Sequence, residues 1–127
     1  MKRLLIAILC IVTCVTVFAK PPKLHVENLF DGRFNNNKSV TVSIYKNNGN
    51  YYRGITVKNN LGIIKKIADA IERDTPRASK YSNHQESNGQ YTSLQVINNG
   101  EVIFIGLQRI QNGSGFFFIQ GKEKAFK

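Results

Sequence analysis

The fold is decided by residues 40–74, VTVSIYKNNGNYYRGITVKNNLGIIKKIADAIERD, where two strand patterns lead directly into a helix pattern. From Val40 to Tyr45 apolar and polar residues alternate, which is typical of a strand that is buried on one face. Asn47–Asn50 then supplies asparagine and glycine, which tolerate a positive φ, so the chain is expected to turn back as a hairpin. The return strand is predicted over Tyr51–Lys58.

The spacing of the apolar residues changes from two to three and four after Asn60. Isoleucine, leucine and alanine share one side of residues 61–71 while lysine and acidic residues take the other, which predicts an amphipathic helix packed on a core. Asn60 is the expected N-cap. Pro76 ends the helix because it has no N–H for the carbonyl four residues back. A short second helical piece is predicted at residues 76–81, and a polar loop at 82–90.

Three further strands are expected in the C-terminal half, at residues 91–97, 101–110 and 116–120. Asn-Gly dipeptides between them favour tight turns. A strand or edge segment is also expected at residues 24–30. Because the links between strands are short, the pairing should be antiparallel. The predicted fold class is α+β: a mostly antiparallel sheet of about five strands with one amphipathic helix on one face, in the order β(β)β-α-βββ.

Two of the expected strands are apolar on both of their faces. Val102–Ile105 and Phe116–Ile119 do not alternate, although a sheet covered on one side should alternate apolar and polar residues. One helix covers only one face, so something else should cover the second. The alternatives are a homodimer partner, a client protein, or the N-terminal segment with Leu29, Phe30 and Phe34.

The first nineteen residues predict a cleavable secretory signal peptide. A positively charged start precedes an uncharged apolar run at residues 4–18, and cleavage is expected after Ala19. The run is shorter than the ~20 residues that a membrane-spanning helix needs, so the chain is not expected to be transmembrane after cleavage. Lipidation at Cys14 is disfavoured because Thr13 stands where a lipobox needs a small residue. An uncleaved anchor is the alternative.

Cleavage after Ala19 leaves 108 of the 127 residues, a length typical of one domain. We expect a flexible leader at 20–23, a single α+β domain at 24–121 and a basic tail at 122–127. Without the two basic residues of the signal peptide, eighteen lysines and arginines become sixteen against eight acids, a net charge of about +8. Such a charge favours an acidic envelope component or an acidic protein as partner, with solubility as the alternative. In an exported protein, nucleic acid is not an expected partner.

No catalytic residue, metal site or cofactor is predicted. Both cysteines, Cys10 and Cys14, leave with the signal peptide, and His25 and His84 lack the spacing of metal ligands. Ser114 lacks the Gly-x-Ser-x-Gly frame of a nucleophile elbow. A non-enzymatic protein is therefore favoured, and the alternative is a small secreted hydrolase or carbohydrate-active enzyme without metal or thiol chemistry.

Two surface clusters are the candidate binding residues. An aromatic–arginine group surrounds the first hairpin turn and consists of Tyr45, Tyr51, Tyr52 and Arg53. Such a tip is a common recognition element, although tyrosine pairs across strands also steady hairpins. A basic group lies on the predicted helix and consists of Lys65, Lys66 and Arg73. A solvated helix face is the alternative reading of the second group.

The chain has an LF…F opening at Leu29–Phe34, a VT strand at Val40–Val42, and a strand at Arg53–Val57 that runs into a helix. A strand led by Tyr91 follows. In this order the features resemble short exported proteins of unknown function common in Bacteroidetes, over residues 29–121. The resemblance implies export and architecture but no activity. The function expected is a binding or interaction module that acts in the periplasm or outside the cell.

Overall fold

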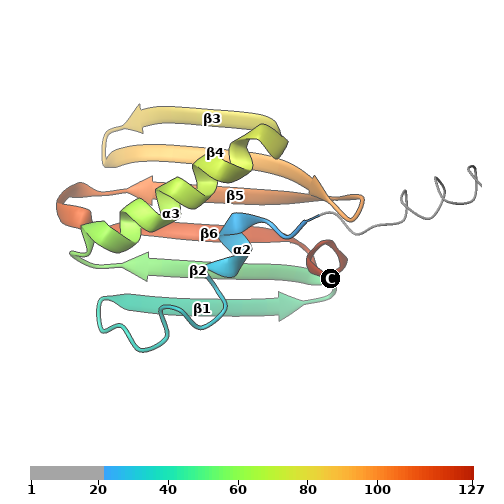
Figure 1. The fold of residues 1–127 in the computed structure, drawn as a ribbon, viewed down its shortest axis with the longest axis horizontal. Helices are drawn as coiled ribbons and strands as arrows, with labels where there is room; N and C mark the ends of the chain where they lie inside the picture. Colours follow the sequence, from blue (N-terminus) through green and yellow to red (C-terminus); the bar gives the residue numbers. More distant parts are fainter. Residues whose placement is uncertain (1–21) are drawn as a thin grey trace, which may run out of the picture.

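The structure is a computed structural model that describes residues 22–127, so the predicted signal peptide with Ala19 lies outside the described residues. Within that range the chain forms a six-stranded antiparallel sheet in the order β1-β2-β6-β5-β4-β3 (Figure 1). The strands are β1 (Val40–Asn47), β2 (Asn50–Val57), β3 (Ala78–Glu86), β4 (Gly89–Asn98), β5 (Glu101–Arg109) and β6 (Gly115–Lys122). The helices are α2 (His25–Asn28) and α3 (Leu61–Asp74), with 3₁₀ turns η1 (Thr75–Arg77), η2 (Gln111–Gly113) and η3 (Glu123–Phe126). The α+β class with an antiparallel sheet is confirmed, and the sheet has six strands where about five were expected.

The first hairpin and the long helix form where their local patterns predict them. β1 pairs with β2 from Val40 opposite Val57 to Asn47 opposite Asn50. The two residues of the turn between them have φ values of 49° and 76°, as a primed two-residue turn requires. The Asn60 side chain accepts a hydrogen bond from the Ile63 N–H at 3.2 Å, which makes it the N-cap of α3.

The segment after α3 differs from its prediction. The turn η1 ends at Arg77, and residues 78–86 form β3, where a helical piece and a loop were expected. β3 pairs with β4 along its length and forms one edge of the sheet. Most side chains of β3 are polar and exposed, because this edge strand contributes few side chains to the core. No apolar alternation therefore marks it in the sequence, and only the pairing with β4 makes it a strand.

The N-terminal segment also differs, because residues 24–30 form α2 and a turn and not a strand. Leu24, Val26 and Leu29 are buried in the same core cluster as the apolar side of α3. α2 lies beside α3 on the same side of the sheet (Figure 1). The N-terminal segment therefore does not cover the second face of the sheet, and that alternative is wrong.

The core lies between the sheet and the two helices. From the sheet, Ile55, Ile105 and Phe117 are almost completely buried, and from α3 Ile67 is. Burial of each such side chain contributes about 1.5–3 kcal/mol to stability, so this layer holds the domain together without disulfides. The basic tail, residues 122–127, packs against one end of the core. Ala125 is fully buried there, and its carbonyl accepts a hydrogen bond from Asn98 Nδ2 at 2.8 Å.

Candidate binding surface

The sheet has one covered face and one open face. Both helices lie on the covered face, and among the described residues no helix packs on the other (Figure 1). The strand register arranges the central side chains of the open face in three rows that each cross all six strands, and Lys122 of β6 and Glu86 of β3 lie beyond these rows on the same face. The first row is Tyr45, Tyr52, Gln120, Phe104, Gln95 and Lys80. The second row is Ser43, Gly54, Phe118, Gly106, Ser93 and Ser82. The third row is Thr41, Thr56, Phe116, Gln108, Tyr91 and His84.

Aromatic rings pave the centre of the open face. The Phe118 ring stacks with Tyr52 at 6.3 Å between ring centroids and with Phe116 at 5.9 Å. Two glycines make room for these rings. A Cβ at Gly106 would overlap the Phe118 ring, and one at Gly54 would lie 2.7 Å from the Tyr52 hydroxyl. The Phe118 and Tyr52 rings therefore lie over the backbone at Gly106 and Gly54. Burial raises the pKa of the Tyr52 hydroxyl.

Phe104 lies between the two hollows of this surface. Its side chain is 45% exposed. The larger hollow, about 580 Å³, is lined by Tyr45 and Tyr52 on the side of β1 and β2. The smaller, about 280 Å³, is lined by Tyr91 and Phe118 on the side of β4. The surface is thus a shallow relief of one aromatic ridge between two depressions.

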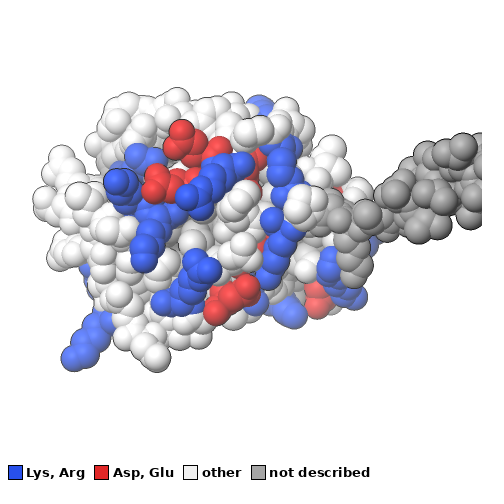
Figure 2. Space-filling view, in the orientation of Figure 1, with Lys and Arg blue, Asp and Glu red and all other residues white. Residues whose placement is uncertain are grey.

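Charge is distributed unequally between the two faces. In the three rows of the open face, Lys80 at the β3 edge is the only lysine, arginine, aspartate or glutamate among these described positions. On the covered face, basic side chains gather over α3 and the segment beside it (Figure 2). The excess of basic residues is therefore displayed mainly on the side of the molecule that carries the helices.

The candidate cluster at the first hairpin is divided between the two faces. Tyr45 and Tyr52 lie on the open face. Tyr51 and Arg53 alternate with them and point to the covered face, where the Arg53 guanidinium lies 5.6 Å from the Phe30 ring and 5.4 Å from the Tyr51 ring. Period-two alternation explains the division, because neighbouring residues of a strand point to opposite sides. The two groups therefore belong to different surfaces.

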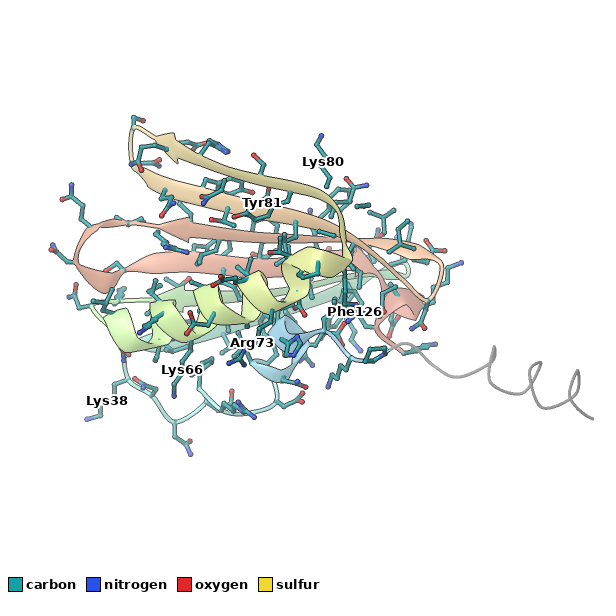
Figure 3. The ribbon with its side chains drawn as sticks, turned by 45° about the horizontal axis from the view of Figure 1, so that its top comes forward. Lys38, Lys66, Arg73, Lys80, Tyr81 and Phe126 are labelled. Atoms are coloured by element: carbon teal, nitrogen blue, oxygen red, sulfur yellow. The ribbon has the colours of Figure 1, made fainter. Side chains whose placement is uncertain are left out.

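The basic candidates on α3 also separate. Lys66 and Arg73 project on the side of α3 that faces the N-terminal segment (Figure 3). Together with Arg33 of that segment they line a hollow of about 540 Å³. Lys65 lines a different hollow, on the side of β3. Residue order does not predict Arg33 as part of this group, because only the packing of α2 beside α3 brings it near Lys66.

The hollow between α3 and β3–β4 is the largest of those described, at about 710 Å³. Two of its polar side chains are joined by a hydrogen bond, which Asn83 Oδ1 accepts from Thr92 Oγ1 at 3.1 Å, while the buried Nε of Arg109 has no partner among the described residues. Its carboxylates, Asp69 and Glu72, are solvent-exposed. The arrangement shows no buried acid that is held ready for proton transfer.

Two acids, Glu27 and Asp74, are buried elsewhere, where the N-terminal segment meets α3. The Oε1 atom of Glu27 has no hydrogen-bond partner among the described residues. Burial raises the pKa of Glu27, and the nearby Lys23 partly opposes this effect. Glu27, Lys23 and Arg53 border a cavity of only about 120 Å³. Within residues 22–127, no three histidine, cysteine, aspartate or glutamate side chains are grouped to hold a metal ion. No described helix has the length and apolarity needed to span a membrane.

Comparison with known proteins identifies a family. A family of unknown function (DUF6108) matches residues 12–103, which is well over half of the chain and extends from the predicted signal peptide into β5. Searches of curated proteins and of solved structures give no match. The resemblance to an uncharacterised family is thereby confirmed. The chain belongs to this family of unknown function, DUF6108.

Proposed function

We propose that the protein is a non-enzymatic binding module, exported from the cytoplasm, that recognises a macromolecular partner through its open sheet face. One observation carries the proposal: the three central rows of the open face are aromatic and hold one charged side chain, Lys80, while both described helices pack on the opposite face. Six strands of about eight residues, spaced about 4.8 Å apart with about 3.3 Å per residue, span about 750 Å². This is close to the area that each partner contributes to a standard protein–protein interface.

The composition of the open face supports binding over solvation. Tyr45 and Phe104 are 58% and 45% exposed, and aromatic side chains are enriched at interface centres from which charged side chains are depleted. Water solvates such a face poorly, and a polypeptide surface would cover the rings. The small polar side chains of the same rows can hydrogen-bond a partner at the rim.

Export rests on the N-terminal sequence. The charged start, the apolar run at residues 4–18 and the small residue Ala19 are the features that signal peptidase substrates share. The site of action that follows is the periplasm or the space outside the cell. There the basic covered face, with Lys66, Arg73 and Arg33, would also attract acidic envelope components.

A small hydrolase is the alternative, and it would place its chemistry in the hollow between α3 and β3. Asp69 and Glu72 are the carboxylates available there. A general acid at neutral pH needs a carboxyl shielded from water, because burial is what raises its pKa into the working range. Both side chains are exposed, so the geometry favours the binding module.

Photo-cross-linking in the native cells tests the proposal. A photoreactive phenylalanine analogue is placed at Tyr45 on the open face or at Leu61 on α3, two positions that are 58% and 71% exposed. We expect a discrete covalent adduct from position 45 and none from position 61. Folded, exported protein that gives no adduct from position 45 contradicts the proposal, as does an adduct from position 61 alone.

A further inference from the structure

We infer that the partner of the open face is a second copy of this chain, bound face to face about a two-fold axis. The inference rests on the proposed function, since it names the occupant of the same surface. Three observations carry it: the area of the face, the distribution of charge, and the relief around Phe104.

The area agrees with that of a dimer interface. The open face spans about 750 Å², and a standard stable interface takes about 800 Å² from each partner. Two sheets pack face to face about 10 Å apart, with their strands close to aligned. Such a pair would form a β-sandwich with the helices of the two copies on its outer sides. A peptide-sized partner would leave most of the rings in water.

The distribution of charge permits self-association of a basic chain. Two copies that each carry a large positive charge repel one another unless their contact keeps the cations apart. Of the three rows on the open face, only the first contains a lysine, Lys80, and that lysine lies at the sheet edge. Lys122, at the end of β6, borders the larger hollow together with Glu101. A face-to-face pair would direct Lys66 and Arg73 outward, on opposite sides of the dimer (Figure 3). An acidic partner, in contrast, would find few cations on the open face.

The relief of the face is suited to a two-fold contact. In an isologous interface the same patch serves both copies, so a ridge and a hollow on one copy meet a hollow and a ridge on the other. Phe104 is the ridge and the hollow of about 580 Å³ beside it is the receptor. Each copy would insert its Phe104 into the hollow of the other. A buried aromatic anchor in a pocket is the usual centre of binding energy in an interface.

Light scattering coupled to size-exclusion chromatography tests the inference, on protein purified from cells that express the full sequence. Across about 1–100 µM we expect a dimer, with a mass twice that of the chain. Phe104→Lys places a charge in the centre of the interface and should raise the dimer dissociation constant at least about tenfold. Leu61→Lys is the matched control: it also replaces an exposed apolar residue with lysine, but on α3, and should leave the dimer unchanged.

The outcomes separate this inference from the proposed function. A monomer throughout that range overturns the second-copy inference, and an adduct from Tyr45 to a different protein would then leave the binding module standing. A dimer whose dissociation constant is unchanged by Phe104→Lys also overturns it, whatever the effect of Leu61→Lys. If Phe104→Lys does not fold, as judged by circular dichroism, Tyr45→Lys at the rim of the hollow decides the question in the same assay.

Discussion

The Oδ1 atom of Asp74 lies 2.8 Å from Nδ1 of His25 and accepts a hydrogen bond from the backbone N–H of His25 at 2.9 Å. Oδ2 of the same carboxylate accepts from the N–H of Val26 at 3.0 Å. These are the first N–H groups of α2, whose N-cap residue Leu24 provides no side-chain cap. A residue at the end of α3 therefore caps a helix that begins 49 positions earlier. This contact ties the N-terminal segment to the covered face.

Replacing Asp74 should release that segment. Asp74→Ala removes a fully buried carboxylate and leaves the buried Val26 N–H without an acceptor, so we expect the free energy of unfolding to fall by about 2–4 kcal/mol. Equilibrium unfolding in urea measures it. Glu72→Ala, an exposed acid in the same turn of α3, should change the value by less than about 0.5 kcal/mol. Equal effects of the two substitutions would contradict the capping role.

Gly106, which lies under the Phe118 ring on the open face, allows a test of how the aromatic rings pack. Gly106→Ala introduces a Cβ that overlaps the Phe118 ring and lies near the Tyr91 hydroxyl, so the rings must shift at a cost of about 1–3 kcal/mol. Gly62→Ala, the control in the first turn of α3, meets only the Asn60 side chain at 3.6 Å and should raise stability by up to about 1 kcal/mol. Thermal unfolding of both variants distinguishes them. A neutral Gly106→Ala would show that the rings do not need the glycine.

The buried acid Glu27 predicts a pH dependence of stability. Burial raises the pKa of Glu27 above its ordinary value, so the folded chain binds this proton more tightly than the unfolded chain does. The contribution to stability is therefore fully present below the unfolded value of about 4.5 and is lost as the pH rises through the folded value.

Glu27→Gln should remove this loss. We expect the variant to gain stability relative to the wild type as the pH increases, with the difference greatest at neutral pH and above. Urea unfolding at several pH values from about 4.5 to 8 measures the two curves. Glu72→Gln, in an exposed position, is the control and should run parallel to the wild type. Parallel curves for Glu27→Gln as well would mean that the carboxyl is solvated in the folded chain.

The hollow on the covered face that is lined by Arg33, Lys66 and Arg73 should bind polyanions in a salt-dependent manner. We expect retention on a heparin column at low ionic strength and release as the salt concentration rises toward about 0.3 M. The double variant Lys66→Gln/Arg73→Gln should elute at clearly lower salt, because both side chains line the hollow beside Arg33. Lys80→Gln, on the open face, removes one charge elsewhere and should have the smaller effect. Retention that ignores ionic strength would exclude an electrostatic site.

Elements with a strong local pattern could be predicted from residue order. The β1–β2 hairpin alternates at period two around an Asn-Gly turn, and α3 begins at an asparagine cap and ends before Pro76. Each of these signals lies within a few residues of the structure that it specifies, so no distant contact is needed to interpret it. The apolar runs of β5 and β6 likewise predict a second apolar sheet face, because neither run alternates with polar residues.

Packing alone decided the remaining features. α2 has four residues, too few to be helical in isolation. It forms because Asp74 caps its first N–H groups and because Leu24 and Val26 pack in the core. β3 carries no apolar alternation and is a strand because β4 lies beside it. The open face is likewise a product of register, which brings Phe104, from β5, into one row with Tyr45 and Tyr52 of the distant first hairpin. Local preference acts over one turn or one hairpin, whereas caps, edges and surfaces depend on residues that only the completed sheet makes neighbours.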